Sequence, residues 1–132
     1  KCVIETDNLN EIFQKCAEAD AILIGSPVYF ADITANTKAF IERAGCLTRA
    51  NNNILARKAG AGIIAVRRGG AIHSFDSINH FFLISQMLIV GSSYWNIGIG
   101  GAAGDCEKDA EGVKTMQTLG ANLNWFLNKI NQ

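Results

Sequence analysis

The segment from Ala21 to Phe30 reads AILIGSPVYF, and it is the strongest indication of the fold in the chain. Its first four residues, 21–24, are all apolar, which is typical of a strand that is covered on both faces in a parallel sheet. The apolar run stops at Gly25-Ser26-Pro27, a turn signal. Two large aromatic residues, Tyr29 and Phe30, then follow where a loop is expected to be polar. This order predicts a buried strand that ends in an unusual surface.

Two more apolar runs, 61–66 and 87–90, predict a second and a third strand of the same kind. Apolar residues at helical spacing surround these strands and predict four helices, at about 8–18, 33–44, 74–85 and 113–130. Alternating helices and strands indicate parallel strands joined by right-handed crossovers. The chain is therefore expected to be one doubly wound α/β domain over residues 1–132.

Helix boundaries are assigned from local signals. Asn8 with Glu11 three residues later is typical of a capping box. Gly45 is interpreted as the end of the second helix, which leaves residues 46–53 as a polar loop. Ser74 is interpreted as the cap of the third helix. The third strand is expected to be followed by a glycine-rich loop of about a dozen residues, a length that favours a functional loop.

Composition limits the classes of function. Of the 132 residues, 48% are hydrophobic and 18% charged, and twelve basic residues balance twelve acidic ones. This balance argues against nucleic acid or an anionic membrane as the main partner. There is no signal segment and no apolar run long enough for a membrane span, so a cytoplasmic location is expected. Four scattered cysteines are interpreted as reduced thiols, with Cys16, Cys46 and Cys106 as small buried or half-buried side chains.

All three predicted strands end in unusual sequences. Ser26–Phe30 reads SPVYF, Arg67–Gly70 reads RRGG, and residues 91–96 read GSSYWN. Each has an ordinary explanation as a turn or as a hydrophobic lid. Because the carboxyl ends of parallel strands converge at one edge of a sheet, however, the three together predict a shared cleft.

The residue types in this cleft favour a flat, mostly apolar ligand with a polar edge. Pro27 fixes the first loop, and the backbone amides that follow are expected to be free to reach a ring edge. Gly69 and Gly70 let the backbone approach closely. Arg67 or Arg68 would offset negative charge on the ligand. The expected ring-contacting side chains are Val28, Tyr29, Phe30, Tyr94 and Trp95. A flavin fits this description.

These motifs, with Lys38-Ala39-Phe40-Ile41-Glu42-Arg43 on the next helix, resemble the flavodoxin-like NAD(P)H-dependent FMN reductases, and most closely their iron–sulfur flavoprotein branch. The resemblance implies bound FMN, with Ser26–Phe30 along the flavin and Arg67–Gly70 near its pyrimidine end. It places Tyr94–Asn96 near the flavin of the same or a neighbouring subunit, in a homodimer or homotetramer. NAD(P)H would stack on the flavin, or electrons would arrive from a cluster.

Two departures from the family pattern stand out. The family's first strand and its phosphate-binding loop correspond to sequence upstream of Lys1, so the domain is expected to lack both. In the iron–sulfur branch four cysteines form a compact group, and Cys2 matches the last of them. Cys2 is therefore a metal ligand only if an upstream cysteine group exists, because a 4Fe–4S cluster needs four thiolates.

The leading hypothesis is an FMN-dependent oxidoreductase that passes electrons from NAD(P)H or a reduced redox partner to a quinone, another small acceptor or an electron carrier. The alternatives are a non-catalytic flavodoxin-like carrier and a fragment that has lost flavin binding. No side chain is assigned a catalytic role, because the cofactor carries the chemistry. His73 is near enough to the second loop to face the cleft, and Asp105 and Asp109 are interpreted as helix-start residues.

Overall fold

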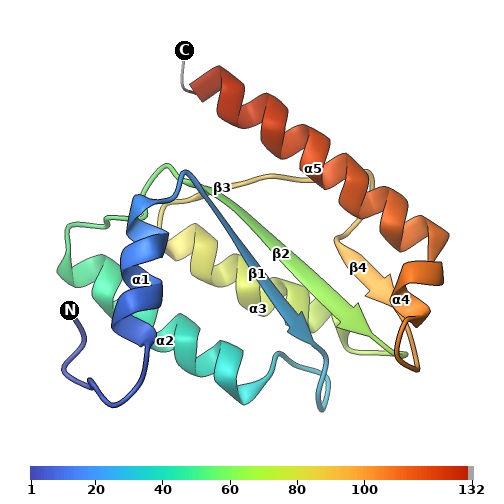
Figure 1. The fold of residues 1–132 in the computed structure, drawn as a ribbon, viewed down its shortest axis with the longest axis horizontal. Helices are drawn as coiled ribbons and strands as arrows, with labels where there is room; N and C mark the ends of the chain where they lie inside the picture. The colour runs from blue at the N-terminus through green and yellow to red at the C-terminus, as the bar shows by residue number, and fades with distance from the viewer. Residues whose placement is uncertain (131–132) are drawn as a thin grey trace.

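The computed structural model describes residues 1–130 and consists of a parallel sheet flanked by helices (Figure 1). β1 (Ala21–Pro27) pairs with one edge of β2 (Ala59–Val66), and two short strands, β3 (Leu88–Ile89) and β4 (Ile97–Ile99), pair with the other. The helices are α1 (Leu9–Glu18), α2 (Ala35–Ala50), α3 (Ala71–Ile84), α4 (Asp105–Lys108) and α5 (Ala110–Ile130). The predicted parallel α/β architecture is confirmed. Within residues 1–130, no helix has the length and apolar character needed to cross a bilayer.

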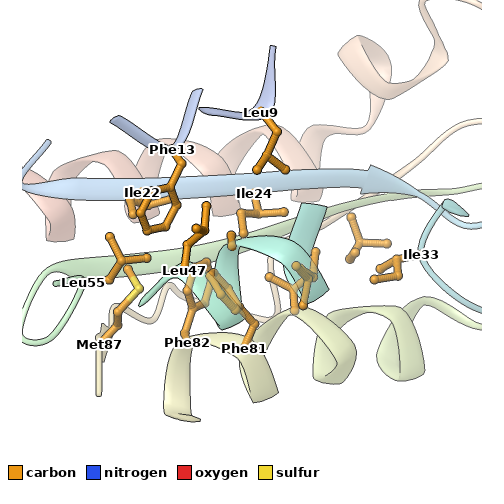
Figure 2. Packing of buried hydrophobic residues seen from close by; sticks show 14 of the residues in the cluster. Leu9, Phe13, Ile22, Ile24, Ile33, Leu47, Leu55, Phe81, Phe82 and Met87 are labelled. Carbon is orange, nitrogen blue, oxygen red and sulfur yellow. The ribbon is translucent and has the colours of Figure 1, made fainter. Parts of the chain in front are cut away.

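The two faces of the sheet are covered differently. α1, α2 and α3 pack on one face and build the main core, in which Ile22 and Ile24 of β1 contact helix side chains such as Phe13 and Phe82 (Figure 2). α5 packs on the opposite face, where Leu119 meets the small residues of β2. The first face therefore holds most of the buried apolar side chains.

β1 is less well covered than predicted on the face of the sheet where α5 packs. Ile22 and Ile24 are buried as expected, and Ser26 is buried as well, but Leu23 on the opposite face is 51% exposed. The reason is that α5 packs over β2, Val90 and β4, and Ala21 is the residue of β1 that packs against it. The prediction that this strand is covered on both faces is wrong for residues 1–130.

The third strand is shorter than predicted, and the expected loop contains a fourth strand. β3 pairs with Ala59 and Gly60 at the start of β2, while β4 pairs with the end of β2. The two are thus halves of one interrupted edge strand. Asn96 spans the interruption, because its carbonyl accepts from the Ile64 amide (2.8 Å) and its side-chain amide donates to the Gly62 carbonyl (3.0 Å). The glycines around Ile-Gly-Ile concealed this strand in the sequence.

The capping box at α1 does not form. The Asn8 side chain makes no capping hydrogen bond, and Asp7 instead accepts from the Leu9 amide (3.1 Å). Glu11 is not available to complete the box, because it pairs with Lys15 (2.7 Å) one turn later. The helix begins where it was predicted, but with a different cap.

Two other helix boundaries also differ. α2 continues past Gly45 to Ala50, because the glycine lies inside the helix facing the Phe81 ring of α3 rather than at a left-handed terminus. α3 begins at Ala71, so Ser74 lies inside it, fully buried, with its hydroxyl donating to the Gly70 carbonyl (3.1 Å). Residues 46–50 are therefore helical, not part of a loop.

Candidate functional site

The chain leaves β1 through a tight reverse turn. The Tyr29 amide donates to the Asp32 carbonyl (2.9 Å), and the Asp32 amide donates back to Tyr29 (3.2 Å). The two central residues, Phe30 and Ala31, have φ of 51° and 66°. This is the type I′ geometry that normally selects Asn-Gly, and a side chain in the left-handed region costs roughly 1–2 kcal/mol per residue.

The aromatic side chains of this turn project into solvent. Tyr29 is 64% exposed and Phe30 is fully exposed. A large apolar side chain that combines a strained backbone with full exposure contributes nothing to the core. Backbone strain of this kind clusters at ligand sites. The turn therefore has the features of a surface that meets another molecule.

Gly70 joins the turn to the end of β2. Its φ is +88°, and a Cβ at this position would lie 2.6 Å from the Cα of Ala31 and 3.1 Å from a methyl group of Val28. Gly69 has open space where its Cβ would be. The RRGG and SPVYF loops are thus in direct contact, and only glycine fits at the contact.

Asp32 anchors the turn to α3. One carboxylate oxygen accepts from the Ile33 amide (2.7 Å) and the Ser77 hydroxyl (2.9 Å), and the other lies 3.4 Å from Nε2 of His73. The Ile33 amide, followed by Ser77 and His73, holds the pKa of Asp32 below its usual value. His73 therefore lies beside the turn. Neither Asp32 nor Ser77 could be found from the sequence, since both resemble ordinary surface residues.

Ser26 and Val28 support the loop from beneath. Ser26 is buried, and its hydroxyl accepts from the Thr34 amide (3.0 Å) and donates to the Pro27 carbonyl (2.8 Å). The expectation of free amides after Pro27 is wrong for the next two residues. The Val28 amide donates to Ala65 (3.0 Å), and the Tyr29 amide closes the turn.

Arg67 and Arg68 follow β2 and are both exposed. Neither forms an ion pair with a carboxylate within residues 1–130. They bring two positive charges to the start of α3, whose N-cap Gly70 offers no side-chain cap. This end of the sheet therefore favours negative charge.

Tyr94 and Trp95 form a second aromatic pair, in an edge-to-face arrangement with centroids 4.7 Å apart. They precede β4 instead of following the last strand of the sheet. With Arg68 and Ile72 they line a hollow of about 260 Å³ between α3, β4 and α5. The structure thus groups the predicted residues in two sets, the turn with Gly70 and the hollow with Arg68.

The two aspartates near α5 act at helix starts, as predicted. Asp109 accepts from the Gly112 amide (3.0 Å) and from the Ile99 amide (2.7 Å), and these bonds lower its pKa. Asp105 accepts from the Ala102 amide (2.8 Å), which, with Gly101, lowers its pKa. Both carboxylates fix backbone and are not free to act as general acids.

Cys2 lies beside α1 and α2, where its backbone amide donates to the Asn10 side chain (2.7 Å). Arg43 donates to its sulfur (3.3 Å) and pairs with Asp7, and the Arg43 contact lowers the pKa of the Cys2 thiol. Within residues 1–130 no group of three or more His, Cys, Asp or Glu side chains could hold a metal. One thiol does not fit a 4Fe–4S cluster, so none is assembled from these residues alone.

The remaining cysteines and surface charges are ordinary. All four cysteines are free; Cys16 is half-buried, whereas Cys46 and Cys106 are exposed, contrary to their predicted burial. Lys38 and Glu42 form an ion pair one turn apart along α2 (3.6 Å). Such exposed pairs contribute little to stability.

Known proteins resemble this chain in sequence. The family model for NADPH-dependent FMN reductases matches residues 1–102. A curated iron–sulfur flavoprotein of Methanocaldococcus jannaschii is 38% identical over 129 residues, covering 93% of this chain and 66% of that protein. An iron–sulfur flavoprotein of Methanosarcina thermophila is 33% identical over 125 residues, covering 92% of this chain and 63% of that protein. The chain thus spans just under two thirds of the length of these relatives.

Solved structures resemble it in fold. RosB with a bound 8-demethyl-8-formylriboflavin-5′-phosphate superimposes with a TM-score of 0.70 at 16% identity, over 96% of this chain and 54% of RosB. A flavodoxin-type, WrbA-like protein of Agrobacterium tumefaciens gives 0.64 at 17% identity, over 85% of this chain and 73% of that protein. The fold is flavodoxin-like.

Proposed function

Because this chain belongs to the NADPH-dependent FMN reductase family, in its iron–sulfur flavoprotein branch, we propose that it binds FMN and acts in electron transfer as part of an oxidoreductase. When bound, FMN supplies hydride and single-electron chemistry, and the protein positions and tunes it.

The flavin ring lies against the surface that the turn at 28–31 and the loop at 67–70 form where they contact each other. The observation that carries this proposal is the Phe30 turn, which is strained, exposed and held in place by Gly70. Tyr29 and Phe30 offer ring faces, and Gly69 leaves room for a ring edge. Gly70 sets the position of the turn against the 67–70 loop, since any side chain at this residue would displace the turn.

Arg67 stabilises negative charge on the pyrimidine side of the ring, and Arg68 adds longer-range positive charge from the neighbouring hollow that it lines. They carry no ion pair within residues 1–130, and the uncapped start of α3 adds a positive dipole end. A site of this polarity favours the reduced, more negative form of a bound flavin.

The FMN phosphate is held by residues outside this chain. Two features support this. β1 is paired along one edge only in the sheet described, and Leu23 is open on its α5 face. A further parallel strand beside β1 would pair with its free edge, and a helix over Leu23 would bury that side chain. A 4Fe–4S cluster, if the whole protein has one, would also need cysteines besides Cys2.

The electrons come from NAD(P)H or a reduced redox protein and pass to a quinone, another small acceptor or an electron carrier, in a homodimer or homotetramer. A visible absorption spectrum of the purified full-length protein tests flavin binding, and anaerobic NADPH addition tests the reductant. Flavin bands that NADPH bleaches rapidly support the enzyme. Flavin that only a redox protein reduces would indicate the carrier instead, and a colourless protein that does not take up added FMN would refute the proposal.

A further inference from the structure

We infer that the hollow lined by Tyr94, Trp95, Arg68 and Ile72 is a binding site for a small planar aromatic molecule that carries one negative charge. This inference goes beyond the flavin proposal and does not depend on it. The hollow borders the Arg67–Gly70 loop at Arg68, where β4, α3 and α5 meet.

The walls of the hollow are apolar and exposed. Tyr94 and Trp95 are 57% and 49% exposed, and Ile72 and Ile99 keep 42% and 58% of their surface open. Four large apolar side chains around one concavity form a patch that is uncommon on a surface without a partner. The edge-to-face pair of rings presents an aromatic wall suited to a flat ligand.

The size of the hollow limits the ligand. Its volume is about 260 Å³, below the roughly 300–1,000 Å³ typical of pockets for drug-sized ligands. A molecule of one or two fused rings fits this volume. A dinucleotide does not, so the site differs from one for intact NAD(P)H.

Charge at the hollow favours one negative group. Arg68 lines it and has no carboxylate partner within residues 1–130, and Ala71 and Ile72 of the uncapped first turn of α3 lie beside it. The opposite rim carries Asp109 and Glu111. Their negative charges disfavour a phosphate or another polyanion, while a single carboxylate or phenolate can pair with Arg68.

The hollow is held open by hydrogen bonds from α5. The Ser92 hydroxyl donates to the Thr115 carbonyl (2.5 Å), and the Asn122 amide donates to the Gly91 carbonyl (2.9 Å). These bonds fix the start of the segment that carries Tyr94 and Trp95, and the bonds between Asn96 and β2 fix its end. A rigid, preformed wall reduces the entropy cost of binding.

The probe for this site is 2-naphthoate, a redox-inert planar anion, titrated into the full-length protein by calorimetry. Comparison with its neutral analogue, 2-naphthalenemethanol, measures how much the negative charge contributes to the binding affinity. Arg68→Gln is expected to weaken naphthoate binding about fivefold, which is the scale of an exposed ion pair. Arg67→Gln is the matched control, because Arg67 is equally exposed but does not line the hollow.

A second variant, Trp95→Leu, is expected to weaken both probes about fivefold through loss of ring contact. Amide NMR shifts at Ile72 and Trp95 locate the bound probe. The inference is overturned if naphthoate does not bind, if the alcohol binds as tightly, if Arg67→Gln has the same effect as Arg68→Gln, or if naphthoate displaces FMN. Absence of flavin in the purified protein would refute the proposed function but would leave the naphthoate result unaffected.

Discussion

Two loops of this molecule each present a pair of aromatic residues, and they do so in opposite ways. In the turn after β1, Tyr29 and Phe30 lie on a strained backbone and face solvent. In the segment before β4, Tyr94 and Trp95 contact each other edge to face and line a hollow. The first loop is therefore suited to pack its exposed side chains on the ring of a bound ligand. The second loop forms one wall of a hollow that is present without a ligand.

The two loops are also held differently. The turn is fixed from α3, through Gly70 and through the Ser77 hydroxyl on Asp32. The second segment is fixed from α5, through Ser92 and Asn122. Substitutions at the anchors of the turn and substitutions at the anchors of the second segment should therefore differ in their effects on the free energy of unfolding and on FMN affinity.

The largest effect is expected from Gly70→Ala. A Cβ 2.6 Å from Ala31 at φ +88° should lower the free energy of unfolding by roughly 2–4 kcal/mol and reduce FMN affinity by at least about tenfold. Urea unfolding and FMN titration measure both. Gly69→Ala, in open space, is the control and should stay within about 0.5 kcal/mol. Equal effects at the two glycines would contradict the contact between the loops.

Asp32→Asn should lower the free energy of unfolding by about 1 kcal/mol at neutral pH, since the hydrogen bonds to Ile33 and Ser77 weaken. The folded-state pKa of Asp32 lies below its ordinary 3.8. The carboxylate therefore stabilises the fold above that ordinary value, and its contribution is lost as the pH falls through the lowered pKa. The difference between wild type and variant should vanish in acid. A difference that persists there, or one matched by Asp76→Asn on the exposed side of α3, would contradict this role.

Phe30→Asn is expected to act in opposite directions on stability and binding. Asparagine tolerates the left-handed region better than phenylalanine, so the free energy of unfolding should rise by about 0.5–1 kcal/mol. FMN affinity should fall about fivefold through loss of a ring contact. A variant that is more stable and binds FMN unchanged would show that the exposed ring has no part in the flavin site.

Ser92→Ala should have the smallest effect. Loss of its hydrogen bond to Thr115 is worth about 0.5–1 kcal/mol and loosens only the second segment. FMN affinity should stay unchanged, while naphthoate binding weakens. A fall in FMN affinity in Ser92→Ala would mean that the two loops form one site.

The sequence predicted the architecture well because its buried strands are short apolar runs with clear turn signals. Ala21–Pro27 and Ala59–Val66 form the strands expected of them. The third strand was harder to predict, since its second half, Ile97–Ile99, is three residues long and bordered by glycine. Pairing with β2, which no local pattern shows, defines that strand.

The candidate site was predicted in part. Gly70 was singled out for close approach of the backbone to a ligand, and in the structure it closely approaches Ala31 of the turn. The anchors Asp32 and Ser77 were missed, because they are 45 residues apart and meet only through packing of the turn on α3. Tyr94 and Trp95 were expected at a strand end, and the interrupted edge strand places them before β4 instead.

The most direct test of the flavin proposal is the set of backbone amides whose NMR shifts change when FMN is added to the isotopically labelled full-length protein, stripped of cofactor beforehand. We expect the largest changes at residues 28–31 and 67–70, with Cys46 and Ile84 on the outer groove of α2 and α3 unaffected. Changes confined to that groove, or none at the turn at saturating FMN, would contradict the assignment of the flavin to the carboxyl end of β1 and β2.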